Sequence, residues 1–539
     1  MATVSLPLLL ALVLARASAA LPANAPRVIL FQLADDFGWS NFGLHGITNY
    51  THNLDALARE GIILDRHYVF KYCSPSRCAL QTGRNPIHVN VLNTPTTQHN
   101  AADPESGQQG APVHMKGLAQ KLAGAGYATH AYGKWNAGMA RAEQTPGGRG
   151  YQHALVYFDY DEYFWNETTT ARCGRQPMTD LYTASGPATR GVNASFTCSQ
   201  TNQSGCIYSD DVFADAAVAA IAEAGRTGAP LFLFWAPHAP HDPYECPASK
   251  LAQFPGIAQQ PRHYYTAMCS VLDDNSGRVR DALHAAGLWN STLWVFSSDN
   301  GGPTGAGYGG NNWPLKGGKA SNLEGGVRVN AFATGGWLPE AVRGTTVSEG
   351  LVGVEDWYTT FCSLAGVDPT DETAAAAGLP PVDGLDVSPL LLAPGAASPR
   401  GEVILGTSLN GKITANGAAS VQGVLRADGW KLLIGELSGA FWQGPVYPNA
   451  SGYPSAQQVC GDPALPAGAP GAGPGCLYNV FQDPTEQRDL AAQEPAIVAE
   501  LRARITAHNA TVFSPDRGED DGAACAALAA GGFWGTFLS

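Results

Sequence analysis

Two apolar stretches of the chain end in paired oxygen-bearing side chains, the kind of ligand that hard cations take. The pairs are Asp35-Asp36, after residues 27–34 (RVILFQLA), and Asp299-Asn300, after residues 291–298 (STLWVFSS). Each stretch has the length and apolar character of a buried strand, and open α/β sheets bind ligands beyond the carboxyl ends of such strands. Carboxylate and amide oxygens suit Ca²⁺ or Mg²⁺, whereas neither pair has Cys or His neighbours at zinc spacing. Each pair taken alone is also typical of a helix cap or a turn.

A third candidate for chemistry is Cys73, in the segment 71–84 (KYCSPSRCALQTGR). Cys78 follows five residues later, with Pro75 and Arg77 between the two thiols. The chain has 11 cysteines, an odd number, so in an oxidising compartment one of them lacks a disulfide partner or is chemically changed. The pattern alone leaves open whether Cys73 is a structural thiol or a reactive group.

The first twenty residues and the glycosylation sequons indicate the compartment. Residues 1–20 combine an apolar core with a small-residue end, which predicts a signal peptide, although no Lys or Arg precedes Arg16. Seven Asn-x-Ser/Thr sequons follow, at Asn49, Asn166, Asn193, Asn202, Asn290, Asn449 and Asn509. Together they predict passage through the secretory pathway, to an extracellular or lysosomal destination. No later apolar run is long enough to predict a membrane span.

Composition narrows the class of protein. The net charge is −14 and no basic cluster is present, which argues against a nucleic-acid partner. With 45% hydrophobic and 14% charged residues, the chain has the balance of a globular protein. Its 539 residues exceed one ordinary compact core, so we expect a large domain and a smaller one.

Strands alternating with helices predict an α/β fold. Besides the two stretches above, residues 231–236 (LFLFWA) are typical of a buried strand. Helical periodicity closed by glycine marks residues 53–61, 117–126 and 210–225. This alternation favours a largely parallel sheet covered by helices on both faces.

A change of composition separates a smaller C-terminal unit. Residues 375–400 are rich in Ala, Pro and Gly, and we place the boundary there, between a large domain at 21–395 and a subdomain at 396–539.

Within the smaller unit, residues 421–437 predict an antiparallel hairpin and residues 494–509 a helix. Cys460 and Cys476 bracket a Pro/Gly-rich loop and are the one disulfide pair that we predict.

The segment around Cys73 resembles the signature of the sulfatase family, Cys-x-Pro-Ser-Arg followed by a Leu and then Thr-Gly-Arg. The matching positions are Cys73, Pro75, Ser76, Arg77, Leu80, Thr82, Gly83 and Arg84. Other stretches also look like sulfatase blocks in family order and span nearly all of the chain after the leader, among them DDFGW, GYATHAYGKW, APHAPHDP, DNGG and NWPLKGGKASNLEGGVR. Within the family, the resemblance is strongest to the arylsulfatase B (N-acetylgalactosamine-4-sulfatase) group.

The resemblance implies a fold like that of alkaline phosphatase. We therefore expect a large mixed, mostly parallel sheet flanked by helices, plus a small C-terminal antiparallel-sheet domain with a helix. Residues 21–395 would form the sulfatase catalytic domain.

The resemblance also implies a sulfuric ester hydrolase of arylsulfatase type, in which a formylglycine-generating enzyme oxidises Cys73 to formylglycine (3-oxoalanine). The hydrated aldehyde offers one hydroxyl that attacks sulfur and a second whose deprotonation expels sulfate, an exit that serine lacks. The substrate would be a sulfated small molecule or a sulfated polysaccharide. If Cys73 is converted, ten cysteines remain, an even number free to pair, with Cys78 among the candidates.

Carried over by position, the family's single Ca²⁺ would be held by Asp35, Asp36, modified Cys73, Asp299 and Asn300. The cation would lower the pKa of the nucleophilic hydroxyl and neutralise sulfate charge.

Four further residues would act on the substrate or on the modified cysteine. Arg77 would brace the formylglycine, and Lys134 and Lys319 would clamp sulfate oxygens. His241 would bind sulfate and help to protonate the leaving alcohol. Taken singly, such lysines and histidines are also typical of a solvated surface or a loop, and His238 and Lys316 are left outside the predicted site.

One position departs from the family pattern. Most sulfatases read Gly-Lys-Trp-His where this chain reads Gly133-Lys134-Trp135-Asn136. The histidine is the expected base for sulfate elimination, and an amide cannot accept a proton at neutral pH. Elimination would be slow, or another group or water would serve as base, or the protein would bind sulfated ligands without turnover.

Two alternatives to a sulfatase stay open. The first is a sulfated-glycan-binding protein with weakened or lost catalysis, which only Asn136 supports. The second is a phosphodiesterase or phosphonate hydrolase of the same superfamily, which is disfavoured because no second-metal histidine set is evident.

Overall fold

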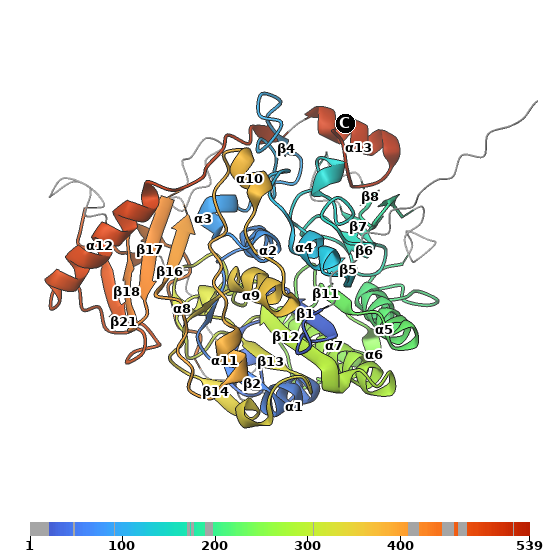
Figure 1. Cartoon of the computed structure of the whole chain (residues 1–539), viewed down its shortest axis with the longest axis horizontal. Coiled ribbons are helices and arrows are strands. Elements are labelled where there is room, and N and C mark those ends of the chain that lie inside the picture. The colour runs from blue at the N-terminus through green and yellow to red at the C-terminus, as the bar shows by residue number, and fades with distance from the viewer. Residues whose placement is uncertain are drawn as a thin grey trace, which may run out of the picture.

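A computed structural model describes residues 21–46, 49–90, 92–169, 173, 177–188, 198–305, 307–407, 420–444, 458–461, 472–520 and 522–538 (Figure 1). The predicted signal peptide at 1–20 and the sequons Asn193 and Asn449 lie outside these residues.

A ten-stranded sheet forms the centre of the molecule. Its strands, in order across the sheet, are β10 (Gly186–Pro187), β9 (Tyr182–Thr183), β6 (His153–Tyr157), β5 (Ala128–Lys134), β11 (Leu231–Ala236), β1 (Val28–Ala34), β12 (Thr292–Ser298), β13 (Ala331–Thr334), β2 (Ile62–Leu64) and β14 (Thr345–Val347). The five strands from β6 to β12 run parallel, while β9 and β13 are antiparallel to their inner neighbours. The predicted mixed, mostly parallel sheet is confirmed.

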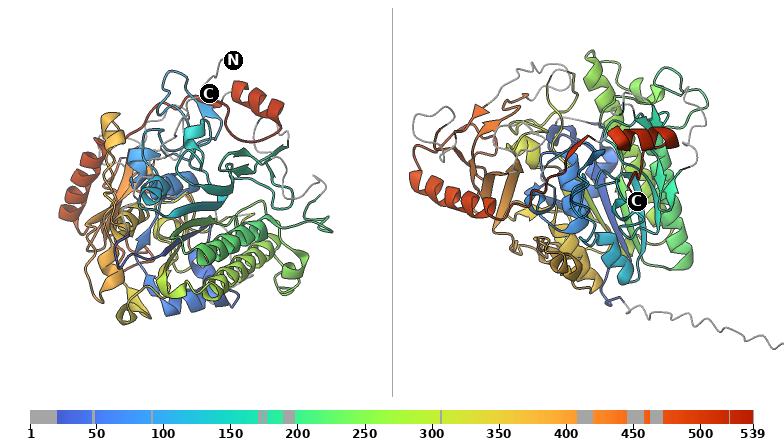
Figure 2. Two further views of the ribbon diagram at one scale, coloured as in Figure 1. Left: turned by 45° about the vertical axis from the view of Figure 1, so that its right-hand side comes forward. Right: turned by 90° about the horizontal axis from the view of Figure 1, so that it is seen from above.

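Helices cover both faces of this sheet. The side chains of a strand alternate between the two faces, and in the central strands both sets are apolar and must be buried. Ile29 and Phe31 of β1 point into one apolar core, and Val28 and Leu30 point into the other. The first core is closed by α2 (Cys73–Thr82), α4 (Leu118–Gly124) and α9 (Asp356–Ala365). The second is closed by α1 (His52–Glu60), α5 (Ser209–Thr227) and α7 (Gln260–Ala285). Figure 2 shows α5 and α7, in green, side by side on their face.

A second, smaller sheet lies at the opposite end of the molecule from α5 and α7 (Figures 1 and 2). It consists of the antiparallel strands β16 (Glu402–Thr407), β17 (Ser420–Arg426), β18 (Trp430–Leu433) and β21 (Cys476–Asn479). Helix α12 (Pro495–Asn509) packs Val498, Leu501 and Ile505 onto it. The predicted small antiparallel unit with a helix is therefore confirmed, whereas the exact boundary at residue 395 stays a prediction.

Short elements complete the described chain. The two-stranded pairs are β3 (His67–Tyr68) with β15 (Val352–Gly353), β7 (Thr168–Thr169) with β8 (Met178–Thr179), β19 (Glu436–Leu437) with β20 (Gln458–Val459), and β4 (Gln98–His99) with β22 (Glu519–Asp520). The remaining α-helices are α3 (Pro86–Val89), α6 (Ala248–Leu251), α8 (Glu324–Val327), α10 (Glu372–Ala376), α11 (Ser388–Leu392) and α13 (Gly522–Gly531). No helix among the described residues is long and apolar enough to cross a membrane.

The C-terminal segment of the described chain returns to the large domain. Strand β22 pairs with β4, and α13 is bonded to the large domain through the disulfide Cys173–Cys525. Trp534 is completely buried, and its N–H donates to the carbonyl of Thr179. The last twenty described residues are thus part of the wall around the larger domain.

Three disulfides form: Cys173–Cys525, Cys198–Cys206 and the predicted Cys460–Cys476. The even number of cysteines besides Cys73 does not lead to five bonds. Cys78 is a buried thiol within α2, 3.8 Å from the Asn90 amide nitrogen, and Cys246, Cys269 and Cys362 are buried thiols as well.

Candidate active site

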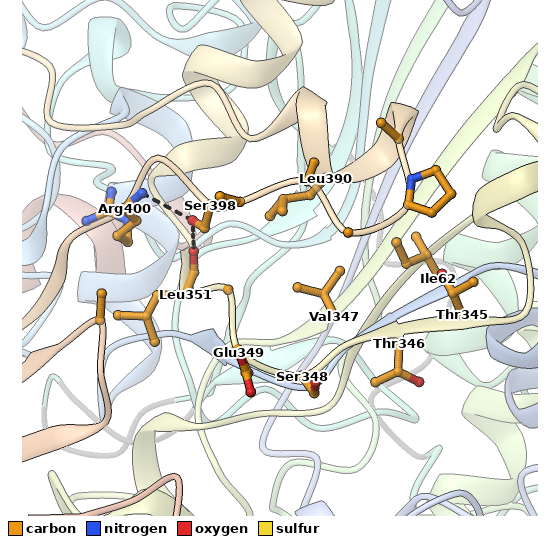
Figure 3. Close-up of a pocket in the computed structure, with 17 residues that line it drawn as sticks. Ile62, Thr345, Thr346, Val347, Ser348, Glu349, Leu351, Leu390, Ser398 and Arg400 are labelled. Carbon is orange, nitrogen blue, oxygen red and sulfur yellow. Dashed lines mark hydrogen bonds between the residues drawn. The ribbon is translucent and has the colours of Figure 1, made fainter.

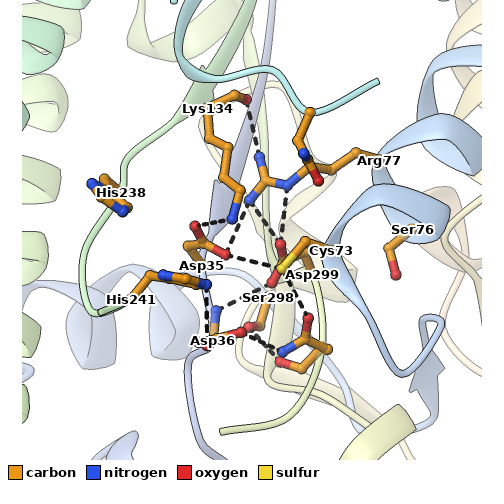
Figure 4. A network of polar contacts seen from close by, with 12 residues as sticks. Asp35, Asp36, Cys73, Ser76, Arg77, Lys134, His238, His241, Ser298 and Asp299 are labelled. Carbon is orange, nitrogen blue, oxygen red and sulfur yellow. Dashed lines mark hydrogen bonds and ion pairs between the residues drawn. The ribbon is translucent and has the colours of Figure 1, made fainter. Parts of the chain in front are cut away.

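The predicted residues meet beyond the carboxyl ends of the central parallel strands (Figure 4). The pairing of Ala34 with Ser298 places Asp35 next to Asp299, since both follow directly in the chain. On the next strands, Gly133 of β5 pairs with Ala236 of β11. Lys134 therefore ends its strand near the loop that carries His241. The strand register brings together side chains that lie far apart in the sequence.

Cys73 is the first residue of α2 and lies at the bottom of this site. Its sulfur is 3.6 Å from Asp35 Oδ1 and 3.5 Å from Asn300 Oδ1. Burial, together with the Asp299 carboxylate, raises the pKa of the thiol well above its ordinary value. An unmodified Cys73 is consequently a poor nucleophile, because the thiolate is the reactive form.

Arg77 holds the carboxylates from the same helix, one turn further on. Its Nε and Nη2 donate to Asp299 Oδ2 at 3.0 and 2.8 Å, and its Nη1 donates to the Lys134 carbonyl at 3.0 Å. Burial opposes the guanidinium charge, yet Asp299 and Asp35 raise the pKa of Arg77 above its usual range. The planar guanidinium fork thereby fixes Cys73, Asp299 and β5 relative to one another.

Two lysines contact the two adjacent aspartates. Lys134 Nζ lies 2.7 Å from Asp35 Oδ2, and Lys319 Nζ lies 2.8 Å from Asp36 Oδ2. Burial alone would raise the pKa of Asp35, but the Lys134, His241 and Arg77 charges bring it down to about 2. Asp36 has a left-handed backbone (φ 64°), a conformation that most residues avoid. Such a conformation persists where the surrounding contacts hold the residue in place.

His241 lies on the other side of Lys319. Its Nδ1 contacts the carbonyl oxygen of Asp242, so this nitrogen carries a proton. Its Nε2 lies 3.1 Å from Lys319 Nζ and 3.6 Å from Asp36 Oδ2. The ring is therefore held with Nε2 facing the aspartates and the clamp lysine.

The donor set fits a hard divalent cation. Ligand atoms of Asp35, Asp36, Cys73 and His241 all lie within 4.8 Å of one another. The Asn300 amide donates to Asp36 Oδ1 at 2.6 Å, which leaves its oxygen on the Cys73 side. Asp299 accepts from the backbone N–H of Asp36 through its Oδ1 at 3.1 Å, while its other oxygen serves Arg77. Carboxylate and amide oxygens of this kind match Ca²⁺.

Asn136 lies just beyond Lys134, in a left-handed conformation (φ 47°) that asparagine tolerates better than most residues. Its Nδ2 donates to the Phe158 carbonyl at 3.2 Å, which directs its Oδ1 away from that strand. Oδ1 is buried and has no hydrogen-bond partner among the described residues. The amide is therefore able to accept a hydrogen bond from a bound group, although it cannot act as a base.

His238 and Lys316, which we left outside the predicted site, have their partners elsewhere. His238 is completely buried, stacks on Phe164 at 3.9 Å and lies 3.8 Å from Glu162 Oε2, behind His241 (Figure 4). Lys316 donates to Gln458 and lies over the Trp442 ring at 4.5 Å. Neither residue contacts the carboxylates of the site in the described structure.

Three residues beside the site escaped the sequence patterns. Asp161 lies within electrostatic reach of His241 and Lys134; burial raises the pKa of this carboxyl to about 6 despite the His241 charge. Tyr72 is partly buried next to Cys73 and within reach of Lys319. Lys71 precedes it, and burial lowers the pKa of its ammonium to about 7. Lys71 and Tyr72 stand immediately before the signature, so their position was available as a signal, but their surroundings were not.

A cavity of about 580 Å³ lies elsewhere, between β14 and residues 393–398 (Figure 3). Its lining includes Ile62, Glu349, Leu390 and Arg400 and none of the predicted site residues. Arg400 is already paired with Asp356 and Glu355. The cavity is therefore separate from the site described above.

Comparisons with known proteins agree with this geometry. The family model described as Sulfatase matches residues 27–367. Arylsulfatase J of Mus musculus is 31% identical over 501 residues, covering 90% of this chain and 76% of the relative. N-acetylgalactosamine-6-sulfatase of Homo sapiens is 32% identical over 378 residues, covering 69% of this chain and 66% of the relative.

A solved structure shares the fold. The crystal structure of Ps i-CgsB in complex with k-i-k-neocarrahexaose superposes with a TM-score of 0.69 at 24% identity and covers 92% of this chain and 95% of its own. The family model alone covers more than half of the chain. The chain therefore belongs to the sulfatase family of sulfuric ester hydrolases.

Proposed function

We propose that this protein hydrolyses sulfate esters of a sulfated glycan, using formylglycine made from Cys73 and one bound Ca²⁺. The observation that carries the proposal is the position of Cys73. Its Sγ lies within 3.6 Å of both Asp35 and Asn300, and the cations of Arg77, Lys134 and Lys319 lie within electrostatic reach of it. Relatives named for N-acetylgalactosamine-6-sulfate and a structural neighbour bound to neocarrahexaose support a glycan as the substrate class.

The charges of the site suit an anionic ester once a divalent cation is present. The carboxylates of Asp35, Asp36 and Asp299 are matched by the cations of Arg77, Lys134 and Lys319. A bound Ca²⁺ would make the site net positive, and it would supply Lewis-acid polarisation of the sulfate oxygens. Lys134 and Lys319 are then free to hold sulfate oxygens, as ammonium groups do for tetrahedral anions.

Cys73 and the residues around it have separate roles in the proposed reaction. Formylglycine, as its hydrate, supplies one hydroxyl to attack sulfur and a second that allows sulfate to leave. Arg77 keeps the start of α2 in register with Asp299. A protonated His241, whose Nε2 lies 3.1 Å from Lys319 Nζ, would donate to the leaving alcohol. Asn136 Oδ1 accepts a hydrogen bond and orients the bound group without taking its proton.

The test begins with the mass of the tryptic peptide 72–77 from protein made in a secretory host. We expect the thiol of Cys73 to be replaced by an aldehyde, and the protein to turn over an aryl sulfate but no phosphodiester. Cys73→Ser, made in the same host, is the matched control and should be inactive while keeping the melting temperature. A retained thiol in protein that turns over no sulfate ester would overturn the proposal.

A second function, binding of sulfated glycans without turnover, is favoured by Asn136 alone. In that case the peptide would carry formylglycine or thiol, and a sulfated oligosaccharide would raise the melting temperature without release of sulfate.

We place the mature protein in the secretory pathway, supported by the leader, the sequons and the three disulfides.

A further inference from the structure

Tyr308 is an exposed aromatic side chain that borders the site. It stands on the chain segment that also carries Lys319, and it is 40% exposed. Four charged groups of the site and its surroundings lie within electrostatic reach of the Tyr308 phenol: Asp36, Asp161, Asp242 and Lys319. Binding sites for small molecules commonly combine an aromatic surface with a few polar groups that fix the orientation of the ligand. Tyr308 therefore offers an apolar surface next to the charges that would hold the sulfate ester.

Two buried tyrosines connect the backbone next to Tyr308 with Asp36. The hydroxyl of Tyr265 donates to the Asp36 carbonyl at 2.6 Å, and the Tyr265 ring meets the Tyr244 ring edge-on, with 6.2 Å between the centroids. The hydroxyl of Tyr244 accepts from the N–H of Gly309 at 3.1 Å. A Cβ on Gly309 would lie 2.3 Å from Tyr265 Cβ, so the backbone packs directly on this tyrosine. The position of Tyr308 is thus set by buried contacts that also hold Asp36.

Two carboxylates give the surroundings of Tyr308 a negative charge. Asp242 Oδ1 lies 3.3 Å from His241 Nδ1, and the Asp242 side chain is 39% exposed, so a ligand can reach it. Asp161 lies within electrostatic reach of both Asp242 and His241. Lys319, the cation within reach of the Tyr308 phenol, is already paired with Asp36 at 2.8 Å. A second anionic group of a substrate would meet two carboxylates here, whereas a hydroxyl group would find acceptors.

We propose that Tyr308 and Asp242 bind the sugar that carries the scissile ester, and that they select a sugar with no second anionic group. This inference rests on the proposed function and narrows its substrate class to sparsely sulfated glycans of neutral sugars. The ring of Tyr308 packs against the C–H face of the sugar, which is the part of a pyranose without hydroxyl groups. The Asp242 carboxylate accepts a charge-assisted hydrogen bond from a sugar hydroxyl.

The same arrangement disfavours polyanionic glycans. A ligand can be rejected by an unpaired like charge as well as selected by a favourable contact, and Asp161 and Asp242 supply that like charge against a second sulfate or a uronate. The net charge of the whole chain, −14, adds a long-range repulsion of the same sign. Local and overall charge therefore favour one sulfate on an otherwise neutral sugar.

The first test removes the aromatic ring. The substrate is the singly sulfated methyl galactoside that the wild-type protein turns over fastest. We expect Tyr308→Ala to raise its KM about 3- to 10-fold with little change in kcat, because a packed aromatic contact is lost. Tyr308→Phe keeps the ring and should keep a KM close to that of wild type. Trp442→Ala is the matched control and should leave the KM unchanged: Trp442 is also 40% exposed, but its ring lies over Lys316 at 4.5 Å and its N–H donates to the Thr485 carbonyl.

The second test removes the negative charge. The wild-type protein should have a lower kcat/KM for the same galactoside with a second sulfate than for the singly sulfated one. We expect Asp242→Asn to raise the ratio of kcat/KM for the doubly over the singly sulfated galactoside about 5- to 10-fold, because the repulsion is removed. Asp161→Asn should raise this ratio in the same direction. A variant that only misplaces His241 would lower kcat/KM for both substrates and leave their ratio unchanged.

A binding measurement separates this inference from the proposed function. Titration calorimetry on Cys73→Ser protein should show weaker binding of the singly sulfated galactoside when Tyr308→Ala is added. If no sulfate ester is turned over but this binding still depends on Tyr308, the proposed function fails and the sugar site stands. If sulfate esters are turned over but the KM in Tyr308→Ala and the ratio in Asp242→Asn equal those of wild type, the inference is wrong. A wild-type protein that prefers the doubly sulfated galactoside would also overturn it.

Discussion

Asn136 lies in the turn after β5 at the position where most sulfatases carry a histidine, and its backbone and its amide both have a defined role. The left-handed backbone (φ 47°) is one that asparagine and histidine adopt more readily than most residues. The donated bond to Phe158 fixes the amide so that only its oxygen is left for a bound group. The geometry accepts a hydrogen bond there and provides no group on Asn136 that can hold a proton.

Replacing Asn136 with histidine should therefore restore a base. We expect Asn136→His to raise kcat for an aryl sulfate about 10- to 100-fold, the lower part of the usual gain from a general base, because the larger ring must fit a buried position. Steady-state kinetics and the amplitude of the first-turnover burst measure the effect. Asn136→Ala, which removes the amide without adding a base, is the control and should be no faster than wild type. An unchanged kcat in Asn136→His would show that another group already performs this step.

His67, in β3, makes the stability of the protein depend on pH. It is buried and accepts from Trp357 Nε1 at 2.9 Å, and burial lowers its pKa from 6.5 to about 3. The folded pKa lies below the unfolded one, so the unfolded chain takes up the proton first as the pH falls. Stability from this residue is fully present above pH 6.5 and is lost progressively as the pH drops toward 3.

We expect the urea concentration at the unfolding midpoint to decrease as the pH is lowered from 7 to 4. The unfolded chain takes up as much as one more proton than the folded protein at His67, which lowers the free energy of unfolding by about 1.4 kcal/mol per pH unit. His67→Gln keeps an acceptor for Trp357 but cannot become charged, so its stability should depend less steeply on pH. Equal slopes for wild type and His67→Gln would contradict this account.

At the scale of elements, the strands of the large sheet that the sequence predicted are the ones with continuous apolar runs. β1, β11 and β12 are buried on both faces, and their composition says so. β5 is buried almost throughout but reads ATHAYGK, and the long helix α7 buries Asp273, Asn275 and Ser276 along with its apolar residues. Neither was predicted, because polar residues that are satisfied by distant partners break the periodicity on which such predictions depend.

Only some of the site residues could be predicted from the sequence pattern. The two acidic pairs could be expected from strand ends, since adjacent parallel strands end at one edge. The roles of Arg77, Lys134 and Lys319 came only from the family resemblance. The atoms that these side chains contact could not be expected at all, because the contacts depend on every segment that folds around them.

Helix α2 depends on the glycine that ends it. Gly83 has a left-handed backbone (φ 68°), and a Cβ there would lie 2.5 Å from Tyr358 Cδ1. Gly228 ends α5 in the same conformation (φ 72°), but a Cβ there would meet only Arg27 Nη2, at 3.6 Å. A side chain would meet the same backbone strain at the two positions but different packing.

Gly83→Ala should therefore destabilise the protein by about 2–4 kcal/mol, and Gly228→Ala by about 1–2 kcal/mol. Differential scanning calorimetry measures both, and only Gly83→Ala should also lower kcat, because α2 carries Cys73 and Arg77. Equal losses of stability in the two variants would mean that Tyr358 moves aside without cost.

At the scale of the whole molecule, a buried charge cluster joins the small sheet to the site. Lys431 of β18 lies 2.8 Å from Glu324 and 2.9 Å from Glu486, and all three side chains are completely buried. Glu324 begins α8, five residues after Lys319, and its N–H donates to Glu486 at 2.7 Å. Burial favours a neutral Glu324, but Lys431 holds the pKa of this carboxyl below its ordinary value.

Removing the shared cation should therefore be costly. We expect Lys431→Met to destabilise the protein by about 3–5 kcal/mol, since it leaves the buried Glu486 without a counter-ion and Glu324 with only Arg328, 3.9 Å away. Lys316→Met is the control: its lysine is buried to a similar degree but has an amide partner, so the loss should stay below about 1.5 kcal/mol. Denaturant unfolding measures both, and similar losses would contradict the special role of the cluster.

The return of residues 519–538 to the large domain has a consequence for the order of synthesis. A nascent chain that has reached residue 510 already contains every residue of the predicted site, but it lacks β22, Trp534 and the cysteine that must find Cys173 across 352 residues. The thiol of Cys173 must stay available for a partner that is synthesised 352 residues later. A stop codon between residues 511 and 525 would therefore release a chain that has every residue of the predicted site but lacks the partner of Cys173, which quality control in the secretory pathway would meet as an unpaired thiol.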